Sequence, residues 1–327
     1  MKRVGCIYNT VASGESLVRA HTEARRGKRN KLPCLEFEKR FGKNIRDLHD
    51  ELVSGAYKPR PYTNFKVYEP KERIIYAPAY RDTVVQHSIY AAINPVFEGV
   101  FIDTSFACRI GYGTHKAADY IQSCINTAPA GSYYLQLDIR KYFASIDRGV
   151  LRGLVSRKIK DERLVDLMML FADHIGTTGI PIGNLLSQLF ALVYLDPLDH
   201  YIKRDLRCKN YARYVDDFLV VGISRQECMI TKRRIEDFLA DRLGLTLSKS
   251  TIQCVDKGIN FCGYRMWRGK RLIRKHSLTR YRRAVLSGRD DRATSLLGHA
   301  KHTHSLPGML DYASIHGLRI PSTYQAL

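Results

Sequence analysis

Two apolar, β-prone runs flank a pair of acids in Tyr211-Ala-Arg-Tyr-Val-Asp-Asp-Phe-Leu-Val-Val-Gly222. Such runs on both sides of a short polar segment predict a tight hairpin with buried strands, and they place Asp216 and Asp217 at its tip. Adjacent carboxylates repel each other, so a fold that holds them at one point usually supplies a cation there. Aspartate is also a common turn residue, and taken alone the stretch fits a polar hairpin turn equally well.

The composition indicates a polyanionic partner. The 327 residues are enough for a large core and for more than one subdomain, and their formal net charge of +21 is typical of nucleic-acid proteins. No stretch approaches the ~18 apolar residues of a membrane span, and Met1-Lys-Arg-Val-Gly-Cys6 lacks the apolar centre of a secretory signal. The eight cysteines are scattered singly, without zinc-site spacing. We therefore expect a nucleic-acid protein of the reducing cytoplasm.

The first part of the chain alternates basic segments with helical and extended patterns. Residues 1–60 predict a basic N-terminal helical extension, in which apolar residues recur at helical spacing from Glu36 to Val53. The basic run before that helix is more often a solvated or flexible face than a specific site. The following segments predict a β-hairpin over residues 62–80 with Lys71 and Arg73 near its tip, a helix over 81–98 with an apolar stripe ending at Pro95, and a helix over 114–125.

The middle of the chain mixes strands and helices, and its C-terminal end is basic. The predicted elements, in order, are a strand over 133–138, helices over 148–173 and 184–202 around a glycine-rich loop at 176–183, the hairpin, a helix over 232–243 and short strands over 245–264. This α+β order is compatible with a split βαβ sheet. Residues 266–327 predict a basic, mainly helical segment that could clamp a phosphate backbone, although a solvated surface helix fits the same pattern.

Asp138 ends a predicted strand, and Asp216 and Asp217 lie on a hairpin that can pair beside it. Carboxylates converging on one sheet edge repel strongly unless a divalent metal is present. Mg²⁺ prefers a few carboxylates plus substrate phosphates, and two such ions roughly 4 Å apart can activate a 3′-hydroxyl and stabilise a leaving pyrophosphate. The pattern therefore indicates nucleotidyl transfer, in which positioning and charge neutralisation supply most of the catalysis.

These residues carry a resemblance to reverse transcriptases. Tyr214-Val-Asp-Asp217 resembles their Tyr-x-Asp-Asp box, and Asp138-Ile-Arg-Lys-Tyr-Phe143 resembles their earlier motif of an acid followed by an aromatic residue. Other segments resemble the remaining motifs in the family's order: Lys71-Glu-Arg-Ile-Ile75, Ser105-Phe-Ala-Cys-Arg-Ile-Gly-Tyr-Gly-Thr-His115, Leu245-Thr-Leu-Ser-Lys-Ser-Thr251 and Asn260-Phe-Cys-Gly-Tyr264. The resemblance implies a right-hand polymerase with fingers at 61–130 and in part of 148–205, a palm at 131–265 with a ferredoxin-like antiparallel sheet, and a thumb at 266–327.

The stretch Gly179-Ile-Pro-Ile-Gly-Asn-Leu-Leu-Ser-Gln188 narrows the resemblance. Most reverse transcriptases have Pro-Gln-Gly here, whereas this chain has Ile182, and its Ser187-Gln188 stands where intron-type relatives usually show Ser-Pro. The pattern is similar to that of reverse transcriptases of bacterial, archaeal and phage diversity-generating retroelements. That resemblance implies dNTPs, a template-repeat RNA copied with errors at adenine into cDNA for mutagenic retrohoming, an RNA/DNA hybrid as product, and a small basic oligomeric accessory protein.

Two other functions fit the sequence. A retron-like or group II intron-like reverse transcriptase has the same polymerase motifs but another biological cycle. A non-catalytic RNA-binding module would also explain the basic charge, and the intact set of Asp138, Asp216 and Asp217 argues against it.

The resemblance implies roles for individual residues. Asp138 and Asp216 would bind two Mg²⁺ (or Mn²⁺) ions, with Asp217 in less direct contact and Ile139 beside them in the metal site. Lys249 stands where the family often has a lysine proposed to protonate pyrophosphate. The nucleotide-binding candidates are Lys71 and Arg73 for the triphosphate, Phe143 for excluding a ribose 2′-OH, and Ile182 and Gln188.

Two residues, Arg109 and Asp147, have a competing structural interpretation, and a third, Ile182, carries a separate hypothesis. Arg109 is the candidate template-binding residue, although an interior, hydrogen-bonded role fits it equally well. Asp147 is better explained as a helix cap than as a ligand. Ile182 cannot hydrogen-bond nucleotide or template as glutamine can, so we hypothesise that it relaxes base selection.

Overall fold

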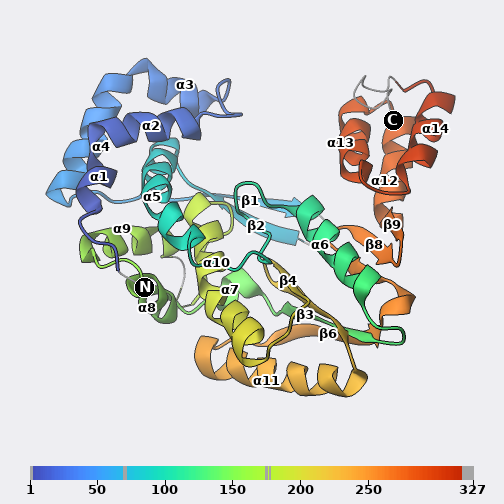
Figure 1. Cartoon of the computed structure of the whole chain (residues 1–327). Helices are drawn as coiled ribbons and strands as arrows, with labels where there is room; N and C mark the ends of the chain where they lie inside the picture. Colours follow the sequence, from blue (N-terminus) through green and yellow to red (C-terminus); the bar gives the residue numbers. More distant parts are fainter. Residues whose placement is uncertain (1–2, 69–71, 174–175, 177, 319–327) are drawn as a thin grey trace. The chain divides into compact units, whose positions relative to one another are not determined.

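The computed structural model describes residues 3–68, 72–173, 176 and 178–318 (Figure 1). The chain divides into two compact units. The first unit comprises residues 1–102, 139–201 and 236–246, and the second comprises 103–138, 202–235 and 247–327. Helix α11 (Arg225–Leu243) begins in the second unit and ends in the first. Within the described ranges, no helix is long and apolar enough to cross a membrane.

The first unit is mainly helical. Its elements are α1 (Tyr8–Ala12), α2 (Gly14–Ala24), α3 (Leu32–Lys39), α4 (Phe41–Ser54), the hairpin β1 (Thr63–Tyr68) and β2 (Glu72–Ala77), α5 (Tyr80–Glu98), α7 (Tyr142–Ser145), α8 (Arg148–Ser156), α9 (Glu162–Ala172) and α10 (Leu185–His200). The hydrophobic helix α5 packs against α2 and α10 (Figure 1). The predicted hairpin over 62–80 is therefore confirmed for the residues that the structure describes, whereas Lys71 lies outside them.

Several helix boundaries differ from the predictions for local reasons. Helix α2 lies before most of the basic N-terminal run: it begins after the cap Ser13, buries Leu17 and ends at Ala24. The single helix predicted over 36–53 is two helices, because Arg40 leaves the helical conformation. The one predicted over 148–173 is also two, because the Asp161 carboxylate caps α9. Helix α5 continues one turn past Pro95, since a proline in the last turn removes only one backbone bond.

The second unit contains a four-stranded sheet and a three-stranded sheet. The larger sheet has the order β4-β5-β3-β6, and the smaller has the order β7-β8-β9. Helix α6 packs against β4 and β5 (Figure 1). The elements are α6 (Thr114–Thr127), β3 (Tyr133–Ile139), a π-helix (Tyr201–Asp205), β4 (Tyr211–Tyr214), β5 (Asp217–Ile223), β6 (Leu247–Cys254), a 3-10 turn (Val255–Lys257), β7 (Ile259–Phe261), β8 (Tyr264–Trp267), β9 (Lys270–Ile273), α12 (Lys275–Leu286), α13 (Asp290–Ala300) and α14 (Leu306–Ile315).

The segment after residue 265 is mainly helical, as predicted, but it begins with a hairpin that the sequence pattern did not predict. Its first residues form a hairpin of β8 and β9, in which Trp267 is the register partner of Lys270. Gly269 has a φ of +63°, which supplies the turn. Burial alternates along β8, where Met266 is buried and Arg265 exposed, so the residues follow a strand period rather than a helical one. Helices begin only at α12.

Candidate active site

The Asp-Asp hairpin lies beside the strand that carries Asp138. Strands β4 and β5 pair through Tyr214 and Asp217, which leaves Val215 and Asp216 in the turn between them. Strand β5 also pairs with β3, and Asp138 is the register partner of Asp217. The predicted hairpin and its neighbour are therefore confirmed. Side chains of directly opposed residues lie close together in an antiparallel pair, so this register brings two of the predicted acids to one place.

The turn itself is strained. Val215 has a φ of +57°, which is rare for a β-branched residue. Arg213 on β4 is fully buried, and its guanidinium donates a hydrogen bond of 3.0 Å to the Val215 carbonyl. The backbone of Arg213 is tied in turn to Thr104 and Phe106, whose segment runs alongside β4. Strained backbone persists where its surroundings over-determine it, and such positions cluster at functional sites.

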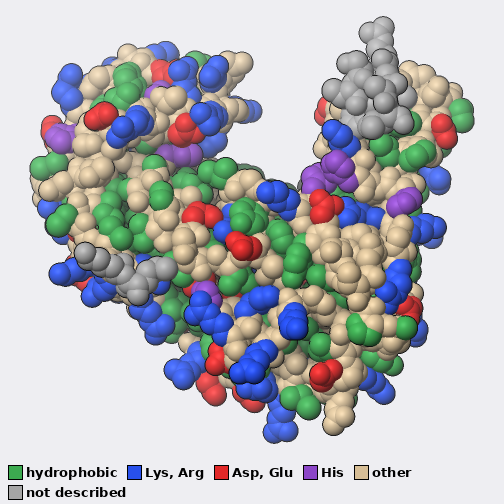
Figure 2. Space-filling model, in the orientation of Figure 1, with side chains coloured by type: hydrophobic (Ala, Val, Ile, Leu, Met, Phe, Trp, Pro, Cys, Tyr) green, Lys and Arg blue, Asp and Glu red, His purple; other side chains and the backbone are tan. Residues whose placement is uncertain are grey.

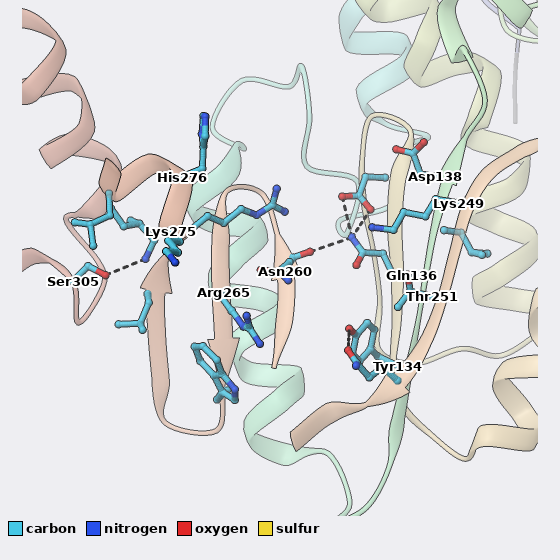
Figure 3. Close-up of a pocket in the computed structure, with 18 residues that line it drawn as sticks. Tyr134, Gln136, Asp138, Lys249, Thr251, Asn260, Arg265, Lys275, His276 and Ser305 are labelled. Carbon is cyan, nitrogen blue, oxygen red and sulfur yellow. Dashed lines mark hydrogen bonds between the residues drawn. The ribbon is translucent and has the colours of Figure 1, made fainter. Parts of the chain in front are cut away.

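Asp217 is held by an amide side chain. The Gln136 amide donates to both carboxylate oxygens of Asp217, at 2.9 and 3.2 Å (Figure 3). Burial raises the pKa of Asp217 to about 6. The hydrogen bond from Gln136 opposes that shift, and the neighbouring charge of Asp138 adds to it. Desolvation and the neighbouring carboxylates both disfavour the ionised form of Asp217, and a bound cation would offset both effects.

Asp138 is held from the other side. The Ser248 hydroxyl on β6 donates to a carboxylate oxygen of Asp138. Figure 3 shows this carboxylate apart from the Gln136 amide. In the described part of the chain, no group of three or more histidine, cysteine, aspartate or glutamate side chains lies in position to share a metal ion. Strands β3 and β5 therefore pair as predicted and bring Asp138 opposite Asp217. The carboxylates of these two residues accept hydrogen bonds from Ser248 and Gln136.

The residues present nevertheless fit Mg²⁺. Asp138, Asp216 and Asp217 supply only hard oxygen donors, which this ion prefers. They sit at the end of two paired strands, and the desolvation and mutual repulsion that raise the pKa of Asp217 are the conditions that a divalent cation relieves. These three residues are the candidates for holding the metal.

The second unit contains a groove of about 870 Å³ beside the paired ends of β3 and β5. Asp138 and Asp217 are the acids among its described lining residues, and the remaining charged groups are Lys249, Arg265, Arg274 and Lys275. Two aromatic residues, Tyr134 and Trp267, also line it, and the Arg265 guanidinium lies 5.0 Å from the centre of the Trp267 ring. Cationic side chains with interleaved aromatic rings suit a nucleic-acid strand. Figure 2 shows further Lys and Arg side chains spread over the visible surface.

Comparison with known proteins assigns the family. A family model described as "Reverse transcriptase (RNA-dependent DNA polymerase)" matches residues 65–266. This chain belongs to that family. The family match together with the antiparallel palm-like sheet confirms the predicted fold class, a right-hand polymerase of mixed helix and sheet, and the prediction of an RNA-directed DNA polymerase.

The reverse transcriptase has relatives in bacteria. It is 28% identical over 294 residues to protein YkfC of Escherichia coli, covering 73% of each chain. It is 25% identical over 296 residues to the group II intron-encoded protein LtrA of Lactococcus lactis, and this match covers 67% of the chain but 49% of LtrA. The chain thus spans about half of that relative. The solved apo telomerase of Candida tropicalis is similar in fold, with a TM-score of 0.50 at 11% identity, covering 84% of this chain and 61% of that one.

Phe143 and the Ile182 loop are joined within the first unit. Phe143 is half-buried, and its carbonyl accepts a hydrogen bond of 2.9 Å from the Ile180 amide. The Gly179 amide donates to the Ile146 carbonyl at 2.7 Å. At the other end of the loop, the Tyr76 amide on β2 donates to the Ile182 carbonyl. The loop at 178–183 therefore connects the candidate steric gate to the β1–β2 hairpin.

The remaining candidates are placed as follows. Gln188 and Arg73 are exposed, on α10 and β2, and Lys249 is exposed on β6, where it lines the groove near Asp138 (Figure 3). Ile139 is buried at the end of β3. Their functional roles stay predictions.

For two residues the geometry favours a structural role over a binding role. Arg109 is buried, its guanidinium donates to the Ser105 carbonyl at 2.9 Å, and it lies 4.0 Å from the centre of the Tyr112 ring. This geometry favours the interior role over direct contact with template. Asp147 caps α8 by accepting a hydrogen bond of 2.8 Å from the Val150 amide, as predicted.

Sequence reasoning missed Gln136, Arg213 and Ser248. The signal for Gln136 was present, since residues two apart on a strand share a face and Gln136 precedes Asp138 by two. A polar residue on the same strand face as Asp138 could have been noted. Ser248 gave no such signal, because Asp138 lies 110 residues away in the chain. Arg213 lies within the hairpin stretch itself, two residues before its partner Val215, but nothing in the sequence marked its side chain as buried.

Proposed function

We propose that this protein synthesises DNA on an RNA template from dNTPs. The observation that supports the proposal is the register of Asp138 with Asp217, two acids that line a groove whose other described charged residues are basic. The acids would hold two metal ions, and the basic and aromatic residues would bind the RNA/DNA hybrid.

The protein's own residues contribute positioning and charge. Mg²⁺, when bound, supplies Lewis-acid stabilisation of the attacking and leaving oxygens. Asp138 and Asp216 would hold the metal ions, and Asp217 would hold or orient them with less direct contact. Lys249 places a positive charge in the groove near Asp138, where it can interact with phosphate. Phe143 restricts the space beside the nucleotide sugar.

We further propose that the enzyme belongs to a diversity-generating retroelement. The support is the Ile182-Gly183 and Ser187-Gln188 pattern, together with the apolar side chain at position 182. In that role it copies a template-repeat RNA with errors at adenine and works with a small basic accessory protein, in the cytoplasm. A group II intron-like role is the second candidate, and the similarity to LtrA favours it.

A primer-extension assay tests the activity. Wild-type protein, with Mg²⁺, dNTPs and its own flanking RNA, should extend a DNA primer on RNA, and Asp216→Asn should reduce the rate by roughly a thousandfold, given the several kcal/mol that metal ions contribute to the transition state. Asp256→Asn, an exposed acid in the same unit, is the matched control. Binding of RNA without extension, with the accessory protein supplied, would indicate the RNA-binding module instead.

Sequencing the cDNA separates the two biological roles. Errors concentrated at template adenines support the diversity-generating role. Errors spread evenly over the bases, with genomic neighbours that form intron ends, support the intron-like role.

A further inference from the structure

We propose that Gln136 is a positioning residue that fixes the orientation of the Asp217 carboxylate in the metal site. Gln136 and Asp138 lie on the same face of β3, two residues apart, and Asp217 lies on the neighbouring strand β5. The inference rests on the proposed polymerase function, because it gives a role to one acid of that site.

Within the described residues, the Gln136 side chain makes three hydrogen bonds, and all of them are donated by its amide nitrogen. One side of the nitrogen faces both oxygens of Asp217, at 2.9 and 3.2 Å, and it also donates to the Asn260 carbonyl at 3.1 Å (Figure 3). All three partners are acceptors. A side-chain amide offers two N–H donors, so only the nitrogen, and not the amide oxygen, can face this position. The chemistry of the partners therefore fixes the amide orientation.

Asn260 anchors the arrangement through its backbone. Because the acceptor is the main-chain carbonyl of β7, the anchor belongs to the strand rather than to a mobile side chain. Gln136 is thus held between β3 and β7, and it presents a fixed donor to Asp217. Both oxygens of Asp217 share that donor, which restricts rotation of the carboxylate about its own axis.

The two acids that face each other in the register have different partners. Asp138 accepts from the Ser248 hydroxyl, whose single proton has a second acceptor in the Asp138 main-chain carbonyl at 3.2 Å. Asp217 accepts from an amide that a further contact to the β7 main chain holds in place. Because of this difference, the Asp138 carboxylate is the one that can give up its hydrogen bond when a metal ion binds. It assigns Asp217 to orientation. Partners that orient a metal ligand typically affect metal affinity or activity by about 10–100-fold when they are removed.

Two substitutions test the assignment in the full-length protein. Gln136→Met keeps the volume and removes the donor, and Gln136→Glu keeps the shape and places a carboxylate against Asp217. Gln226→Met, an exposed glutamine at the start of α11, is the matched control. The measurements are Mn²⁺ binding by electron paramagnetic resonance without nucleotide, the Mg²⁺ concentration for half-maximal primer extension, and kcat and KM for dNTP.

The expected result for Gln136→Met is weaker Mn²⁺ binding and a higher Mg²⁺ requirement, by about 10-fold or more, with kcat lowered and KM for dNTP nearly unchanged. In Gln136→Glu the added carboxylate should instead tighten Mn²⁺ binding, while kcat falls because Asp217 is no longer oriented by a donor. Unchanged metal dependence in both variants, with native circular dichroism, would overturn the inference and leave Gln136 a sheet residue. If Gln136→Met does not fold, the result for Gln136→Glu decides. If the wild type binds Mn²⁺ but extends no primer, the proposed function is wrong. In that case the comparison of Mn²⁺ binding between the wild type and the Gln136 variants still tests whether Gln136 orients the metal site.

Discussion

The Tyr76 amide donates a hydrogen bond of 2.7 Å to the Ile182 carbonyl. This contact joins β2 to the loop that also touches Phe143 through its Ile180 amide. The residue at position 182 therefore fastens the loop through its main chain, whatever side chain it carries. Its apolar side chain is free to differ between relatives without loss of that contact.

Gly183 is the position where the same junction tolerates no side chain. Its φ is +120°, and a Cβ there would lie 2.7 Å from Ile75 Cγ2 and 3.0 Å from the Tyr76 carbonyl. Gly183→Ala should lower the free energy of unfolding by about 1–3 kcal/mol, because both the backbone and the contact are strained. Urea denaturation measures this. Gly153→Ala, in α8 with open space around it, should be neutral or stabilising, and an equal loss in both variants would contradict the prediction.

Ile182→Gln should lower misincorporation opposite template adenine, if the missing polar contact is what relaxes base selection. The fold should tolerate the change, since the hydrogen bond with Tyr76 uses the main chain. The measurement is cDNA sequencing beside Ile182→Leu, which keeps an apolar side chain. An adenine error rate that is the same in both variants and the wild type would remove Ile182 from the account.

Phe143→Ala should admit ribonucleotides. Removing the ring frees the volume that a 2′-OH needs, and discrimination by volume is typically worth about 10- to 200-fold. Extension rates with each dNTP and the matching rNTP give the ratio. The Phe143 carbonyl keeps its bond to the Ile180 amide in this variant, so the loop should stay in place. A preserved preference for dNTPs would show that another residue is the gate.

The second unit should lose stability in mild acid. His115 and His299 both contact the Tyr264 hydroxyl, at 3.0 and 3.2 Å, and burial lowers the pKa of each. The charges of His302 near His115 and of Arg274 near His299 lower the two pKa values further, whereas Asp119 near His115 and the Gly263 hydrogen bond to His299 oppose the shift without cancelling it. A histidine pKa that is lower in the folded state means that the unfolded chain binds more protons.

The stability contributed by these neutral histidines is therefore complete above the ordinary histidine pKa of about 6.5, and it is lost as the pH falls below that value. Urea denaturation of the wild type between pH 8 and pH 5 should show the loss, and His299→Gln should reduce the slope. The same slope in the variant would show that other groups govern the acid response.

The order of the motifs and the local chemistry of the hairpin could be derived from sequence, because each depends on residues close together in the chain. The alternation of apolar and polar residues gave the hairpin at 211–222 and the strand ending at Asp138. The side-chain oxygen of Asp147 needs only the amide three residues later, so its capping role was also predictable. The helix start at Asp161 follows the same local rule, because its carboxylate accepts from the Leu164 amide, and it could have been predicted in the same way. The break at Arg40 could not, since Arg40 makes no capping side-chain hydrogen bond.

The residues alone show that three acids, a high positive net charge and the order of reverse transcriptase motifs occur together in this protein. Which side chains hold Asp138 and Asp217 depends on the folded sheet. Gln136 reaches Asp217 across a strand pair, and Ser248 reaches Asp138 from β6, more than a hundred residues along the chain. Contacts of this kind depend on strand order and register, and these are set by packing of the whole sheet rather than by neighbouring residues.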